Sequence, residues 1–230
     1  GMFWIVLGPI LLLSIYTAIY AFIFRVRPEA LSVEEYILYV FSGLVPFLAF
    51  SASLTQGAMS LAANRQILLS TVFPPDLLPL RAVLIASIIL PIGLILVTIG
   101  DVIFGHLTWY TLWVVPIIIL QTMFLSGVAW VLSLLTIVMR DIQQILQYVT
   151  IMLLVVTPIA YTPDMIPAKL KMVMYANPLS YYTTSFQYVL SYDTHPPTEI
   201  LFGAFALSFL SFYGGFWMFQ KVKMSFYDYV

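Results

Sequence analysis

The chain has no cysteine and very few charged residues. Without cysteine, disulfide bonds and thiol chemistry are excluded. Only 8% of the residues are charged, whereas a globular domain carries about 25%. The net charge of −1 argues against a nucleic-acid partner, because binding phosphates needs a basic surface. The sequence also lacks a GxxxxGK[ST] phosphate loop, so this chain does not bind ATP in the common way.

Apolar residues make up 62% of the chain, and the mean hydropathy is +1.03. The apolar runs are continuous rather than alternating, which predicts an all-α integral membrane protein and no β-barrel. A transmembrane helix needs roughly 20 apolar residues. Six segments meet this requirement, at about 3–24, 36–62, 82–104, 112–138, 142–161 and 200–219.

Six spans place both termini on the same side of the membrane, and we expect that side to be the cytosol. The lysine and arginine count favours it weakly, with five residues inside and four outside. Lys221 and Lys223 directly follow the last span, and Arg65 and Arg81 bracket one short loop. The chain begins almost inside its first span, so we expect preceding residues.

Two connections carry most of the information outside the spans. The first is the segment 64–81, in which Pro75 can open a short helix and Pro79 either limits it or begins the next span. The second is 162–199, which is far longer than a turn. We expect it to hold two short helices at about 167–176 and 179–192, divided at Asn177-Pro178.

Aromatic residues make up 16% of the chain and fall on helical faces. In the second short helix, Tyr181, Tyr188 and Tyr192 share one face with Ser185, opposite the apolar face of Tyr182, Phe186 and Val189. For any single aromatic residue, membrane-interface anchoring or ordinary packing is the better interpretation. A channel wall is the functional one, since sugar rings stack on aromatic rings and bond to phenols. Its candidates within the spans are Tyr16, Tyr20, Phe24, Phe47, Phe50, Tyr148 and Tyr161.

Candidates for catalysis or metal binding are sparse. His106 and His195 fall in separate predicted loops, and no set of three or four clustered metal ligands appears in the sequence. Glu34 and Glu35 mark a solvated span entrance. Asp101 is the one ionisable residue within a span, and we expect it at the interface near His106, which disfavours a proton-driven pump.

Small and polar residues in two spans predict close helix packing. Span 2 carries the run Ser51, Ser53, Thr55, Gln56, Gly57 and Ser60. Small residues let helices approach closely, and Gln56 needs a partner in the membrane interior. Gly214-Gly215 in the last span is interpreted in the same way.

Three stretches, in order along nearly the whole chain, carry a family resemblance. They are Gly43-Leu44-Val45-Pro46-Phe47 leading through Ser51 to Asn64, then Val72-Phe73-Pro74 through Leu78-Pro79-Leu80, and finally Arg140-Asp141-Ile142, Thr157-Pro158-Ile159-Ala160-Tyr161 and Ala176-Asn177-Pro178-Leu179. In these the sequence resembles the permease subunit of ABC-2 type polysaccharide exporters, which move O-antigen, capsular polysaccharide or teichoic acid.

The resemblance implies a homodimer of six-span subunits in the inner membrane, docked on a separate ATPase that binds ATP and Mg. It implies that the loop 64–81 contacts this ATPase, and that the segment 162–199 folds back as an external gate bearing Tyr181, Tyr188 and Tyr192. The coupling residues would be Pro74, Pro75, Asp76, Leu77, Leu78, Arg140 and Asp141. This chain itself would hold no cofactor and no metal.

Two alternatives stay open from the sequence. One is an ABC-2 exporter of drugs or lipids. The other is a membrane-embedded transferase, which needs acid and base residues near the interface. Asp101, His106 and Asp164 are available for that role, but they are not clustered in the sequence.

Overall fold

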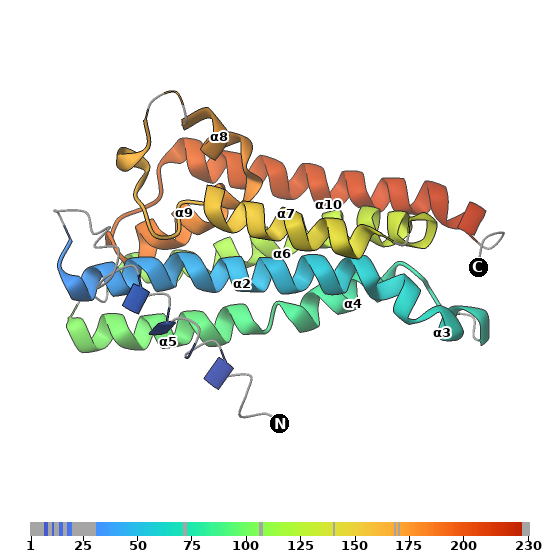
Figure 1. The fold of residues 1–230 in the computed structure, drawn as a ribbon, viewed down its shortest axis with the longest axis horizontal. Coiled ribbons are helices and arrows are strands. Elements are labelled where there is room, and N and C mark those ends of the chain that lie inside the picture. Colours follow the sequence, from blue (N-terminus) through green and yellow to red (C-terminus); the bar gives the residue numbers. More distant parts are fainter. Residues whose placement is uncertain are drawn as a thin grey trace. The chain divides into compact units, whose positions relative to one another are not determined.

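The computed structural model describes residues 7–8, 11, 14–15, 18–19, 31–70, 73–105, 108–139, 141–167, 169 and 171–226. Helices are the regular structure of these residues, as the all-α prediction requires (Figure 1). In chain order they are α2 (Val33–Ala63), α3 (Arg65–Ser70), α4 (Leu77–Ala86), α5 (Ile89–Phe104), η2 (Trp109–Trp113), α6 (Val114–Val138), α7 (Ile142–Val156), η3 (Pro163–Met165), α8 (Lys171–Ala176), α9 (Pro178–Leu190) and α10 (Thr198–Phe226).

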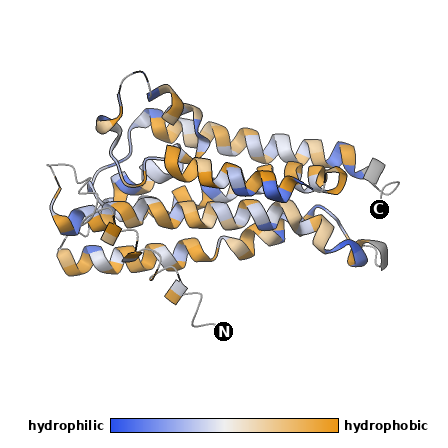
Figure 2. Ribbon diagram, in the orientation of Figure 1, coloured by the Kyte–Doolittle hydropathy of each residue, from blue (hydrophilic) through white to orange (hydrophobic). Residues whose placement is uncertain are grey.

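Four helical stretches in the described residues are long and apolar enough to cross a membrane: Val33–Ala63, Leu77–Phe104, Trp109–Val138 and Thr198–Lys223. Figure 2 shows hydrophobic residues along nearly their whole length. The predicted spans 36–62, 82–104, 112–138 and 200–219 lie within them. The predicted span 3–24 lies largely outside the described residues, so the count of six spans stays a prediction.

Side chains cap the starts of two helices. The backbone N–H of Ser32 donates to Glu35 Oε2 (2.7 Å), and the N–H of Glu35 donates to Ser32 Oγ (3.2 Å), which is a capping box at the start of α2. Glu35 therefore does more than mark a solvated entrance. At α9, the Asn177 side chain accepts the N–H of Leu179 (3.0 Å), and Pro178 occupies the first helical position, which needs no N–H.

Helix α7 is shorter than the predicted span 142–161, because it ends at Val156. The cause is Thr157-Pro158, since the residue before a proline is pushed out of the helical conformation. Fifteen residues give a helix of roughly 22 Å, which is less than the ~30 Å of a bilayer's hydrocarbon core. Residues 157–161 therefore continue the path of α7 in non-helical form.

The segment 64–81 also differs from its prediction. The segment contains a short helix, but this helix is α3, near the beginning of the segment. No helix starts at Pro75. Helix α4 begins at Leu77 and continues through Pro79 to Ala86, so Pro79 begins the next span rather than limiting a turn. Proline is tolerated there because the first turn of a helix needs no internal N–H donor. A turn at Ser87 and Ile88 then separates α4 from α5.

The described residues divide into two compact units. Unit 1 comprises those in 1–48, 89–118 and 153–204, and unit 2 those in 49–88, 119–152 and 205–230. The core of unit 1 is rich in aromatic rings: Tyr36, Tyr39, Tyr182 and Phe186 are fully buried. In α9, Tyr182 and Phe186 form the predicted apolar face with Val189, which is equally buried.

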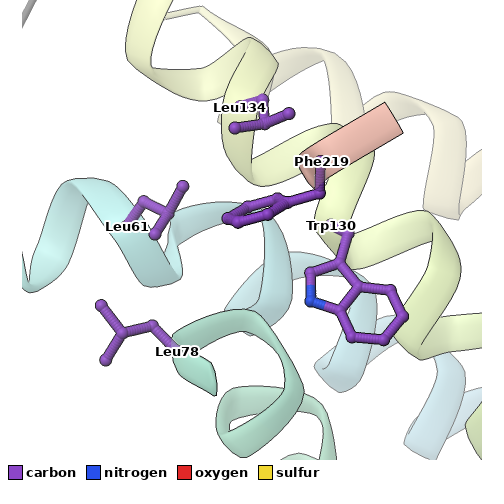
Figure 3. Close-up of a cluster of buried hydrophobic side chains, with 5 residues drawn as sticks. All are labelled: Leu61, Leu78, Trp130, Leu134 and Phe219. Carbon is purple, nitrogen blue, oxygen red and sulfur yellow. The ribbon is translucent and has the colours of Figure 1, made fainter. Parts of the chain in front are cut away.

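The core of unit 2 gathers side chains from four helices (Figure 3). Leu61 of α2, Leu78 of α4, Trp130 and Leu134 of α6, and Phe219 of α10 are all buried in one cluster. Figure 3 shows the Phe219 ring in the middle of this cluster. The cluster joins the end of α2 to the start of α4.

Helices α6 and α10 approach closely enough in unit 2 for their backbones to touch. A Cβ atom added to Gly215 would collide with the backbone of Gly127, and one added to Gly127 would collide with the backbone carbonyl of Ser211. The hydroxyl of Ser211 donates to the Phe124 carbonyl (2.9 Å) at the same contact. A Cβ atom on Gly214 would meet nothing within 4 Å. Among the described residues of this chain, the predicted close packing is therefore found at Gly215 and not at Gly214.

This difference predicts opposite outcomes at adjacent positions. Gly215→Ala should destabilise the fold by about 1–3 kcal/mol, because the helices must separate to admit the methyl group. Gly214→Ala should leave the melting temperature unchanged or slightly raised, since alanine favours helix over glycine. Melting curves of both variants in the same detergent measure the effect. Equal melting temperatures would contradict the close contact.

Candidate functional site

The non-helical segment 157–161, which we call the clamped segment, has its backbone carbonyls bonded by side chains of unit 1. Gln187 of α9 donates its Nε2 to the carbonyls of Pro158 (2.8 Å) and Ile159 (3.3 Å). The carbonyl of Ala160 accepts the Tyr36 hydroxyl (2.9 Å), and that of Tyr161 accepts the Tyr39 hydroxyl (3.0 Å). Helices α2 and α9 thus supply the donors that a continued helix would have supplied.

Two further contacts hold the clamped segment. The Asn177 side chain donates its Nδ2 to Thr157 Oγ1 (2.8 Å) while its oxygen caps α9. Gly43 of α2 makes room for the Gln187 amide, because a Cβ atom there would lie 2.6 Å from Nε2. The segment therefore joins the end of α7 to α2 and α9.

Three tyrosine rings from α2 and the α9 region lie together in unit 1. The rings of Tyr188 and Tyr192 are 5.3 Å apart, and Tyr39 meets Tyr192 edge to face at 5.7 Å. Burial raises the pKa of Tyr192 to about 12, with further increases from Tyr188 and Asp164. The phenol of Tyr192 is therefore neutral at ordinary pH and available as a hydrogen-bond donor.

The predicted tyrosine face of α9 is only partly correct. The helix ends at Leu190, so Tyr192 lies beyond it rather than on its face. Tyr181 has a separate setting: its hydroxyl donates to the Tyr175 carbonyl (2.9 Å) and its ring packs on Gly203. The cluster of rings is therefore Tyr188 and Tyr192 with Tyr39, which the sequence did not single out.

A cavity of about 380 Å³ lies in unit 1 beside the clamped segment. Its walls include Val156 at the end of α7, Tyr161 of the clamped segment, and Met165, Val173 and Met174 from the stretch around η3 and α8. The Tyr161 hydroxyl donates to the Val156 carbonyl (2.5 Å), which folds this ring back toward α7. The clamped segment and α8 thus border an open, largely apolar space.

The other predicted channel residues fall into three settings. Phe47 and Phe50 are buried by their own chain, and the Phe50 ring stacks on Phe124 at 6.4 Å. Tyr148 of α7 is 73% exposed, so its ring is free to meet another molecule. Tyr16, Tyr20 and Phe24 lie outside the described residues.

The predicted coupling residues alternate between exposed and anchored positions in unit 2. Leu77 is 44% exposed, while the next residue, Leu78, is 3% exposed and belongs to the buried cluster. The Asp76 carbonyl accepts the Trp130 indole N–H (2.9 Å). Pro74 is exposed and Pro75 half-buried.

Of the second coupling pair, Asp141 is exposed at the start of α7, and Arg140 lies outside the described residues. The Asp141 carbonyl accepts the N–H groups of Gln144 (3.0 Å) and Ile145 (3.1 Å). Its side chain is left toward solvent at the helix N-terminus, where a negative charge is favourable.

Asp101 is buried within unit 1. It is 1% exposed, and neither carboxyl oxygen has a hydrogen-bond partner among the described residues. Its place at the membrane interface stays a prediction. Asp101 interacts electrostatically with Asp193, which accepts the Thr108 hydroxyl (3.2 Å). The predicted neighbour His106 lies outside the described residues.

The remaining candidates for acid–base chemistry are placed at the surface. Asp164 is exposed in η3, and His195 is exposed with its ring edge toward Tyr110, at 6.5 Å between centroids. The described residues contain no group of three or more His, Asp or Glu side chains placed to hold a metal ion.

Sequence reasoning missed Gln187, Tyr36 and Tyr39 as the donors that hold the clamped segment. A signal existed in Thr157-Pro158, because a break in an apolar run frees carbonyls that must find donors within the protein. Which side chains supply these donors depends on contacts between distant parts of the chain. Tyr36 and Ala160, for example, are more than a hundred residues apart, and sequence periodicity does not predict such contacts.

The sequence matches the ABC-2 type transporter family over residues 1–191. The chain therefore belongs to this family and is a multi-pass membrane protein, a transport subunit rather than an enzyme. Two relatives from Klebsiella pneumoniae, each named O-antigen export system permease protein RfbA, are 30% identical over 184 residues, which is 78% of this chain and 68% of theirs. A relative of the same name from Myxococcus xanthus is 23% identical over 230 residues, covering 98% of this chain and 86% of its own.

The clamped segment gives a direct test of its hydrogen bonds. Gln187→Leu should destabilise the fold by about 1–3 kcal/mol, since it leaves two buried carbonyls without a donor. Gln187→Glu should also destabilise it, because a carboxylate of similar size cannot donate. Gln147→Leu, at an exposed position on α7, is the matched control. Melting temperatures in detergent measure the three effects. An unchanged melting temperature for Gln187→Leu would contradict a role of Gln187 in holding the clamped segment.

Proposed function

We propose that this chain is the channel-forming subunit of an ATP-driven exporter that moves a polysaccharide across the cytoplasmic membrane. One observation carries the proposal: most of the chain is similar to permeases named for O-antigen export. The polysaccharide is of the O-antigen kind and is lipid-linked. Capsular polysaccharide and teichoic acid are the related substrates within the same class.

One exposed and two half-buried aromatic rings support a sugar substrate. Tyr148 projects from α7 with its ring exposed, and Tyr188 and Tyr192 pair their rings beside the clamped segment. Phenol rings stack on the apolar faces of sugars, and their hydroxyls bond to sugar hydroxyls without fixing the sugar's identity. Among the described residues, no hydrogen-bond partner occupies the hydroxyl of Tyr188 or Tyr192. These residues form the channel wall and the external gate.

The exporter is a homodimer with a separate ATPase on the cytosolic side, where both termini lie. The exposed, apolar face of α7, with Ile151, Met152 and Val155, supports contact with a second copy. The segment around Leu77 supports contact with the ATPase, because it pairs an exposed residue with a firmly anchored one. ATP and Mg bind the partner, whose movement reaches this chain through residues 74–78 and 140–141.

Polysaccharide export predicts a defined phenotype. Deleting the gene should remove the surface polysaccharide, and the wild-type chain should restore it. Tyr148→Ala should lower export about two- to tenfold through the lost stacking, while Tyr148→Phe keeps the ring and most of the export. Phe202→Ala, at a ring equally exposed on α10, is the control. Surface glycan is measured by gel electrophoresis, and an unchanged glycan in the deletion strain would refute the function.

Among the proposed coupling residues, we expect substitutions of Leu77 and Leu78 to have different effects. Leu77→Asp should weaken binding of the ATPase roughly tenfold, as expected for one central contact residue, with an unchanged melting temperature. Leu78→Asp should instead lower the melting temperature, because it buries a charge in the cluster of Figure 3. Copurification of the ATPase with each variant measures the contact. Full retention of the ATPase by Leu77→Asp would remove Leu77 from the contact.

A further inference from the structure

A second cavity lies in unit 2. Its volume is about 350 Å³, within the range of small-molecule sites. It opens between the last turns of α2 and the start of α4. Most of its wall is apolar, with Met59 and Ala63 from α2 and Leu78, Ala82 and Ile85 from α4.

Two side chains on this wall are strong hydrogen-bond donors. Arg81 of α4 and Gln56 of α2 both line the cavity. Both side chains are exposed, and neither has a hydrogen-bond or ion-pair partner among the described residues. The amide of Asn64, also on the wall, differs because its Nδ2 is bonded to the Ser60 carbonyl (2.7 Å). The cavity therefore presents an unpaired guanidinium and an unpaired amide.

These two donors lie on helices apolar enough to cross a membrane. A polar group in such a helix needs a partner, and an arginine on it faces a cavity or an opposite charge. No acidic side chain lines the cavity. An anion with several acceptor oxygens would pair with both donors at once. A phosphate meets both conditions, because its oxygens match the guanidinium fork.

The surroundings of the cavity indicate that this phosphate carries hydrocarbon chains. Leu84, Ile85 and Ile88 are each 51% exposed beside it on α4 and in the following turn. Exposed aliphatic side chains on a membrane helix face lipid tails. An ion without a tail would leave both this strip and the apolar wall uncovered.

We propose that the cavity lined by Gln56 and Arg81 is a binding site for the phosphate of an anionic membrane phospholipid. The headgroup phosphate accepts from the Arg81 guanidinium and the Gln56 amide, and the acyl chains lie along Leu84, Ile85 and Ile88. Basic cavities between membrane helices are suited to such headgroups. The site does not depend on which glycan is exported.

The test titrates dioleoylphosphatidylglycerol onto the full chain, purified and delipidated in neutral detergent, with bound lipid counted by native mass spectrometry. The wild-type chain should bind it saturably. Arg81→Gln should weaken this binding roughly tenfold, as expected for losing a hydrogen bond to a charged group. Arg81→Lys should fall between the two, because it keeps the charge without the fork. Ala82→Phe should block binding by filling the cavity with the charges unchanged.

Arg65→Gln is the matched control, since Arg65 lies on the neighbouring α3 and does not line the cavity. It should bind the lipid as the wild type does. Unchanged binding by Arg81→Gln and Ala82→Phe would overturn the proposal. Equal binding of dioleoylglycerol would rule out the phosphate as the recognised group. Full competition by inorganic phosphate would make this an ion site, and tighter binding of a polyprenyl phosphate would assign it to a lipid carrier.

Discussion

The structure of unit 1 depends on satisfying the backbone carbonyls where α7 stops. Thr157-Pro158 ends the helix before it is long enough to cross a membrane, so residues 157–161 carry free carbonyls in an apolar setting. An unsatisfied carbonyl in such a setting costs several kcal/mol. Gln187, Tyr36 and Tyr39 supply donors from two other helices. The burial of these tyrosines and the glycine at position 43 follow from that requirement.

Close approach at small residues joins several helices of unit 2. Gly57 of α2 lies against Ala129 of α6, where an added Cβ atom would be 2.6 Å from the alanine methyl. Gly127 and Gly215 bring α6 and α10 together in the same manner. Small residues at such contacts are the usual means of joining helices in a membrane, where water does not drive apolar surfaces together. The buried hydroxyls of Ser53 and Ser87 add one polar contact, at 3.0 Å.

The sequence predicted what depends on composition and on local rules. Long apolar runs located four membrane-length helices, and Asn177-Pro178 located the boundary between α8 and α9. It failed where the outcome depends on contacts between distant segments. The position of Asp101 near the end of an apolar run did not predict its burial, because packing against other segments decides it. Phe47, Phe50 and Tyr148 are all aromatic residues within predicted spans, and only the fold separates two buried rings from an exposed one.

The bond between Trp130 and the Asp76 carbonyl has a mechanical consequence. The indole is also held at 5.1 Å from the rings of both Phe212 and Phe216 on α10. Moving the chain at Asp76 therefore requires moving α6 and α10 with it or breaking this partly buried hydrogen bond. A displacement of the loop at Asp76 would therefore also displace α6 and α10, because Trp130 contacts all three segments.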